Sequence, residues 1–229
     1  DDGFLDHYQY VLPVLRKYNL WGIFFPVTGP LTNGALLDVH KVHLILGKLG
    51  SEKAVEELHK IIKSEAMMIS KNNDIMENTY LRQSGDEPSI AFKRILNYGV
   101  SGSSRSEVIN RLISLSVGEE EASFATTYYL NKSHLREMIS EGMVIGGHTV
   151  SHPILSTLDE QGQRREIEES ISLLRTFTEA DIDLFAYPYG IKNSFNSLTE
   201  RILRDNGIVM SFVDDPRDIS DLDFLQHRY

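Results

Sequence analysis

Strand-like and helix-like segments alternate along the C-terminal part of the chain. Short runs rich in β-branched and aromatic residues, the composition of buried strands, lie at 21–27, 143–147, 182–188, 208–213 and 222–227. Amphipathic helical patterns separate the second, third and fourth of these runs. Strands that alternate with helices form βα units, so we predict an α/β fold with a largely parallel sheet or barrel.

Four short polar motifs stand at predicted strand ends. They are DDG at 1–3, GGHTVSHP at 146–153, AYPYG at 186–190 and QH at 226–227. In α/β folds the functional residues lie at the carboxyl ends of the strands. Four polar motifs in that position are harder to attribute to chance than any one alone, so they define the candidate site.

The segment 31–125 has a different character. Its apolar residues follow helical spacing, and it contains no convincing strand pattern. We predict a mostly helical insertion over 31–125, which leaves 1–30 and 126–229 as one discontinuous domain. Within the insertion, Asp38, His40 and His43 have two interpretations: a second metal site, or the polar edge of an amphipathic helix.

The composition excludes several kinds of partner and site. The chain has 229 residues and a net charge of −10, which argues against nucleic acid or anionic lipid, because basic surfaces bind both. No run of about 18 apolar residues is present, so we expect no membrane span. Because the chain has no cysteine, any metal must be bound by His, Asp or Glu. No signal peptide is visible, which favours the cytoplasm without deciding the compartment, and the oligomeric state stays open.

His148 and His152 are the candidate metal ligands in GGHTVSHP. Pro153 disfavours a helix at His152, so we predict a turn, which can direct both rings at one ion. Two histidines and a carboxylate are a common ligand set for a divalent metal such as zinc. One of Asp1 and Asp2 could supply the carboxylate, and the other could accept a proton from water. The alternatives are a histidine pair that caps loop carbonyls and an Asp-Gly turn.

These motifs, in this order, resemble the polysaccharide deacetylases of carbohydrate esterase family 4, which carry the NodB homology domain. The resemblance rests on DDG, HTVSHP, FAYPYG and a terminal LQH, and covers about 1–29 and 126–227. It implies an irregular (β/α) barrel, here with a mostly helical insertion. The family normally has a strand ending in Thr-Phe before Asp-Asp-Gly, which implies that the chain begins inside a motif and is truncated at its N-terminus.

The resemblance also implies roles for particular residues. The implied metal ligands are Asp2, His148 and His152. Asp1 matches the general base that activates water, Tyr189 the residue whose backbone N–H stabilises the oxyanion, and His227 the general acid that protonates the leaving amine. An arginine that often orients the base is replaced here by Ala186. Arg228, or alternatively Arg217, is our candidate for that orienting cation; the alternative for each is a surface role.

From these residues we predict a metal-dependent hydrolase, with zinc as the favoured metal, that removes N-acetyl groups from amino sugars of a poly- or oligosaccharide. An N-acetylated carbohydrate is the expected partner. Two alternatives stay open: a catalytically inactive carbohydrate-binding protein on the same fold, and a hydrolase of another acyl group such as formyl or O-acetyl.

The sequence also suggests roles for three other histidines and a start for one helix. We interpret His7, His59 and His134 as solvated or capping residues. Ser197 and Glu200 have the spacing of a capping box at the start of a helix.

Overall fold

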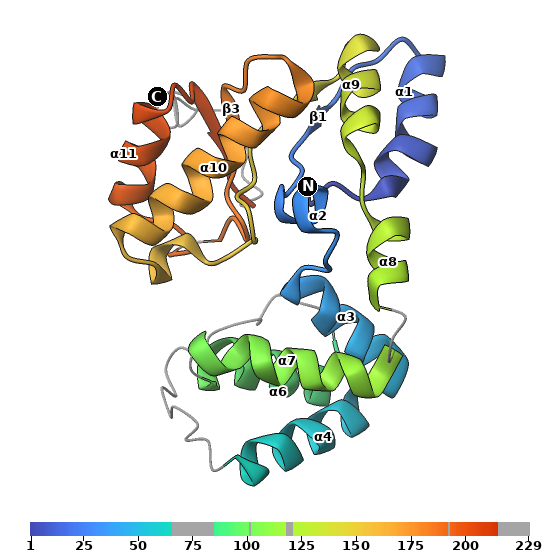
Figure 1. Ribbon diagram of the computed structural model, residues 1–229, viewed down its shortest axis with the longest axis vertical. Helices are drawn as coiled ribbons and strands as arrows, with labels where there is room; N and C mark the ends of the chain where they lie inside the picture. Colours follow the sequence, from blue (N-terminus) through green and yellow to red (C-terminus); the bar gives the residue numbers. More distant parts are fainter. Residues whose placement is uncertain (66–84, 101, 118–120, 192, 215–229) are drawn as a thin grey trace. The chain divides into compact units, whose positions relative to one another are not determined.

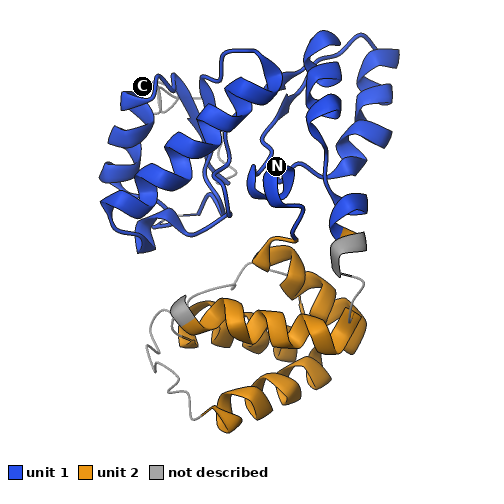
Figure 2. Ribbon diagram, in the orientation of Figure 1, with its two compact units in different colours: residues 1–35, 125–229 blue, residues 36–124 orange. Residues whose placement is uncertain are grey.

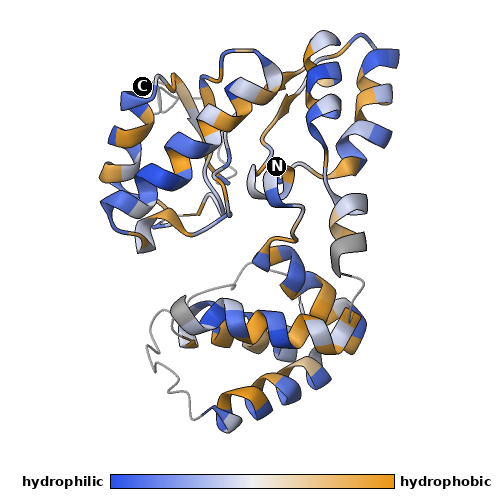
Figure 3. Ribbon diagram, in the orientation of Figure 1, coloured by the Kyte–Doolittle hydropathy of each residue, from blue (hydrophilic) through white to orange (hydrophobic). Residues whose placement is uncertain are grey.

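A computed structural model describes residues 1–65, 85–100, 102–117, 121–191 and 193–214. The chain divides into two compact units, residues 1–35 with 125–229 and residues 36–124 (Figure 2). We call them unit 1 and unit 2. Helices in both alternate apolar and polar residues along their length, the pattern of amphipathic helices (Figure 3). None of the described helices is long and apolar enough to cross a membrane.

The described residues of unit 1 contain four short parallel strands: β1 (Ile23–Phe24), β2 (Val144–Ile145), β3 (Leu184–Ala186) and β4 (Met210–Phe212). β1 pairs with β2, and β3 pairs with β4. A parallel bridge between Gly147 and Phe185 connects the two pairs, so the strands follow one another in chain order. The predicted run at 222–227 lies outside the described residues. Each observed strand is shorter than its predicted apolar run: Trp21 and Val209, at the starts of two runs, are exposed, and Pro26 and Gly147 form only isolated bridges.

Helices cover these strands (Figure 1). They are η1 (His7–Val11), α1 (Leu12–Lys17), α2 (Gly29–Asn33), α9 (Lys132–Ser140), η4 (Leu155–Thr157), α10 (Glu160–Thr178) and α11 (Ser197–Asp205), while α8 (Glu121–Tyr128) spans the boundary between the two units. Their apolar faces and the strands form one core, which includes the fully buried side chains of Leu135, Ile171, Phe185 and Leu203. This core fixes the strand ends that carry the polar motifs.

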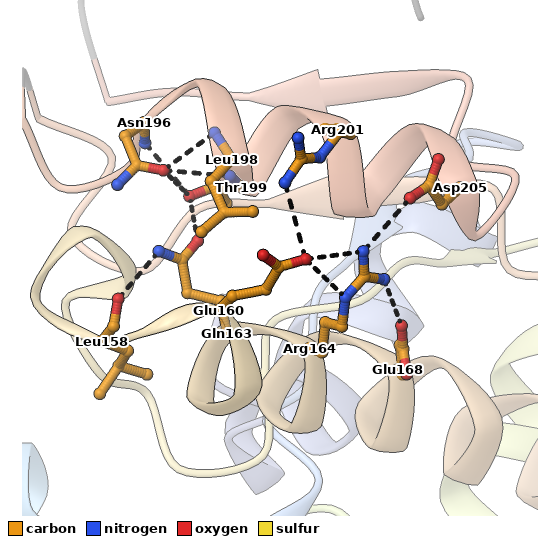
Figure 4. A network of polar contacts seen from close by, with 10 residues as sticks. All are labelled: Leu158, Glu160, Gln163, Arg164, Glu168, Asn196, Leu198, Thr199, Arg201 and Asp205. Atoms are coloured by element: carbon orange, nitrogen blue, oxygen red, sulfur yellow. Dashed lines mark hydrogen bonds and ion pairs between the residues drawn. The ribbon is translucent and has the colours of Figure 1, made fainter.

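Polar contacts fix helix α10 against helix α11 (Figure 4). The buried Thr199 hydroxyl donates to the Gln163 side chain at 2.6 Å, and Gln163 in turn donates to the Leu158 carbonyl at 3.1 Å. On the exposed side Arg164 bridges Glu160 and Glu168, a surface network that contributes little stability by itself. The buried bonds are the stronger constraint, and they set the position of α10 beside the site.

Helices are the only regular secondary structure among the described residues of unit 2. It comprises α3 (Asp38–Leu49), α4 (Ser51–Ser64), α6 (Glu87–Arg94), η2 (Ile95–Gly99) and α7 (Gly102–Val117). α3 packs on α7 and α4 packs on α6. Fully buried aliphatic and aromatic side chains from every one of these segments form its core, namely Ile45, Leu58, Phe92, Leu96 and Ile109.

Candidate metal centre

Asp2 is positioned by a tight turn beside the end of β1. Its backbone forms a parallel bridge with Pro26, and the Gly3 N–H donates to the Asp1 carbonyl at 2.9 Å. Gly3 has a φ of +74°, and a Cβ there would lie 2.8 Å from the Cβ of Pro26. Only glycine meets both conditions without strain. The Gly in DDG therefore brings Asp2 to the carboxyl end of the strands.

His148 follows β2 and is 1% exposed. Its Nδ1 lies 2.7 Å from the Ala186 carbonyl oxygen. Because a carbonyl can only accept, Nδ1 must carry the proton and donate it, which leaves Nε2 as the ligating atom. That Nε2 is buried and has no hydrogen-bond partner within the described part of the chain. A buried ring nitrogen in this state is suited to a metal ion.

A left-handed turn brings His152 back toward His148. Thr149 and His152 have φ values of +66° and +59°, and the His152 N–H donates to Thr149 Oγ1 at 3.0 Å. The ring centroids of the two histidines consequently lie 5.0 Å apart. The turn predicted from Pro153 is confirmed.

Asp2, His148 and His152 converge on one point. The Nε2 atoms of the two histidines lie 3.5 and 3.4 Å from Oδ1 of Asp2, and the three ligand atoms lie within 4.8 Å of one another. Two ligands, each about 2.1 Å from a tetrahedral ion, are about 3.4 Å apart. The donor types and their spacing therefore fit a divalent ion such as zinc.

Backbone strain concentrates at this point. Seven non-glycine residues of the described ranges have positive φ, and four of them are Asp2, Thr149, His152 and Tyr189. Left-handed backbone is unfavourable for residues with a Cβ, above all for a β-branched one. Strain that gathers around one constellation indicates that the constellation has a function.

Tyr189 and Asp1 flank the three candidate ligands. The Tyr189 ring centroid lies 4.9 Å from that of His152. The Tyr189 turn is attached to the end of β4, because the Asp214 N–H donates to the Gly190 carbonyl at 3.0 Å. Asp1 is exposed and precedes Asp2 directly.

Several predicted residues fall elsewhere. His227, Arg217 and Arg228 lie outside the described residues, so their roles stay predictions. Ala186 is buried, and its carbonyl rather than its side chain contacts the site, through His148.

Two residues that contact the site loop were not predicted from the sequence. Thr149 holds His152, and Glu166 on α10 accepts three hydrogen bonds from the loop. Thr149 lies inside the motif and its spacing to His152 was visible. Glu166 is one of several acidic residues on a long amphipathic helix, and nothing in the sequence distinguishes it from its neighbours.

Comparison with known proteins shows which family part of the chain is similar to. A family model, polysaccharide deacetylase, matches residues 115–211, a range that includes His148, His152 and Tyr189. A search of curated proteins gave no match.

Solved structures of similar fold include two deacetylases. The BpsB deacetylase domain from Bordetella bronchiseptica is 13% identical, with a TM-score of 0.51 over 95% of this chain and 62% of that one. The deacetylase PplD from Streptococcus pyogenes, in complex with acetate, is 16% identical, with a TM-score of 0.46 over 91% and 50%. The chain described here thus spans about half to three-fifths of their length. The prediction of an irregular (β/α) barrel of the deacetylase type is confirmed.

Proposed function

We propose that this domain is a metal-dependent hydrolase that removes N-acetyl groups from the amino sugars of a poly- or oligosaccharide. The observation that carries the proposal is the convergence of Asp2, His148 and His152 at the strand ends of a deacetylase-type barrel. A divalent ion held by these residues, with zinc the best match to two imidazoles and a carboxylate, would polarise the amide carbonyl and lower the pKa of water.

The remaining chemistry belongs to groups around the ligands. Asp1 accepts the proton of the attacking water, whose oxygen bonds to the acyl carbon. The Tyr189 backbone N–H donates to the oxyanion that develops on the carbonyl. The carbon–nitrogen bond then breaks, and His227 gives its proton to the departing amine. Acetate and a free amino sugar are the products.

Acetate release tests this proposal directly. The protein is loaded with Zn²⁺ or Co²⁺ and incubated with N-acetylglucosamine oligomers, and acetate and new primary amines are quantified together. We expect the two products in equal amounts, and neither with His148→Ala. Matched N-formyl and O-acetyl sugars distinguish the acyl group. Glycan binding without any acyl release by the metal-loaded protein would instead support an inactive carbohydrate-binding domain.

A further inference from the structure

A single carboxylate on α10 holds the turn between the two histidine ligands. Oε2 of Glu166 accepts hydrogen bonds from the backbone N–H groups of Val150 and Ser151, both at 2.9 Å. Its Oε1 accepts from the Ser151 hydroxyl at 2.7 Å. Hydrogen bonds to an ionised acceptor are roughly twice as strong as neutral ones. Glu166 therefore fixes two consecutive peptide groups of the site loop.

The other side of the same turn is held by the start of α2. The Thr28 and Gly29 N–H groups donate to the carbonyls of Thr149 and Val150 at 3.2 and 2.8 Å. A Cβ on Gly29 would lie 2.6 Å from the Val150 oxygen, so glycine is needed for this close approach. The backbone N–H groups of the turn thus donate to Glu166 on α10, and its backbone carbonyls accept from the start of α2.

These hydrogen bonds hold the turn in its strained, left-handed conformation. Left-handed Thr149 and His152 persist only if surrounding contacts over-determine their conformation. Glu166 can supply such a contact rigidly, because the buried Gln163–Thr199 bond and the core fix α10 (Figure 4). Relaxation of the turn would move His152 away from His148 and Asp2.

We infer that Glu166 is a positioning residue of the metal centre, whose carboxylate holds the 148–152 turn in the conformation that ligates the ion. The inference rests on the proposed metal-dependent function, and it concerns affinity for the ion rather than the chemical step. Glu166 does not contact the reacting atoms; it acts through Val150 and Ser151.

The test measures metal affinity in a graded series of variants. Co²⁺ or Zn²⁺ binding is determined by competition with a chelator for the wild type, Glu166→Ala, Glu166→Gln and Ser151→Ala. We expect Glu166→Ala to weaken affinity by about 10- to 100-fold, the usual effect of removing an outer-shell partner. Glu166→Gln retains an amide oxygen that can accept from both N–H groups, so it should lose less metal affinity. Ser151→Ala removes only the hydrogen bond from the Ser151 hydroxyl, so it should lose the least affinity.

Controls separate this role from general stability. Glu169→Ala changes an exposed glutamate on the same helix and should leave affinity unchanged. Circular dichroism verifies that each protein is folded at the assay temperature, and Glu166→Gln keeps the test decisive if Glu166→Ala does not fold. Wild-type affinity in both folded Glu166 variants would overturn the inference.

The outcomes also distinguish the two proposals. If the wild type binds the ion tightly but releases no acetate, the proposed activity is overturned. The effect of Glu166 on metal affinity can still be tested in that case. A wild type that binds no divalent ion would overturn both.

Discussion

Two segments of this protein carry nearly the same residues and use them differently. In unit 1, His148 and His152 lie on a left-handed turn and meet Asp2, which comes from the other end of the sequence. In unit 2, His40 and His43 lie on the regular helix α3 together with Asp38. His40 is buried and His43 exposed, so the two rings do not share an environment.

The acidic residues differ in the same way. The Asp38 carboxylate of α3 accepts from Arg105 at 2.8 Å and from Ser106 at 3.0 Å, both on α7. Asp38 thereby joins two helices, whereas Oδ1 of Asp2 lies 3.5 and 3.4 Å from Nε2 of His148 and His152. The candidate centre thus combines a carboxylate from a distant segment with a left-handed backbone, and neither is present where the histidines of α3 lie close in sequence.

The largest expected effect comes from removing one of the candidate metal ligands. His148→Ala or His152→Ala leaves two protein donors, and sites of this type usually need three. We expect each change to abolish both metal retention and acetate release, measured by elemental analysis and product assay. The matched control is the double change of His40 and His43 to Ala, which should keep the full metal content. Loss of one metal equivalent in the control would revive a second site on α3.

Asp1 gives the next largest effect. Asp1→Asn removes the proposed base while Asp2 and both histidines remain, so the metal should stay bound. Turnover should fall by about 10² or more, the scale expected for a lost general base. The assay uses protein in which further residues precede Asp1, because a free α-amino group beside Asp2 would disturb the site. Near-normal turnover with metal bound would show that Asp1 is not the base.

Two glycines sharpen the comparison between the units. Gly29→Ala would place a Cβ 2.6 Å from the Val150 oxygen, so it should destabilise unit 1 by roughly 1–3 kcal/mol and weaken metal binding. Gly47→Ala lies within α3, where nothing approaches a Cβ within 4 Å. It should stabilise the helix by roughly 0.5–1 kcal/mol. Urea unfolding measures both, and equal effects at the two positions would contradict this distinction.

The sequence predicted the parts of the site that depend on local rules. Parallel strands, a turn at His152 and polar motifs at the strand ends follow from alternation, from Pro153 and from the general behaviour of α/β folds. Helix starts were less accurate: the predicted Ser197–Glu200 box is wrong by one residue, because Asn196 caps α11 and pairs with Thr199. Asparagine and serine are about equally good caps, so spacing alone could not choose.

What the sequence could not supply is the tertiary support of the site. Glu166 contacts Val150 and Ser151 only because α10 packs at a particular position and rotation. Helical periodicity identifies which face of α10 is apolar, but not which glutamate on the remaining face reaches the loop. The left-handed conformation of Thr149 is equally invisible, since β-branched residues disfavour it.

The smallest expected effect concerns a histidine that has a structural role. His134 lies in a capping box at the start of α9, as its capping interpretation predicted, and its Nδ1 accepts from the Asn131 N–H at 3.2 Å. Burial lowers the pKa of His134 below its ordinary value of 6.5. Between the folded and unfolded pKa values the unfolded chain binds more protons, so stability increases with pH in that window.

The contribution of His134 is therefore fully present above about pH 6.5 and is lost as pH falls through the folded pKa. His134→Gln keeps a side-chain acceptor that does not titrate, so the difference in melting temperature between the two proteins should change with pH below about 6.5 and be constant above it. Melting curves from pH 5 to 8 provide the measurement. A wild-type minus His134→Gln difference that stays flat across the range would show that the imidazole keeps its proton affinity on folding, and that the capping contact does not depend on a neutral ring.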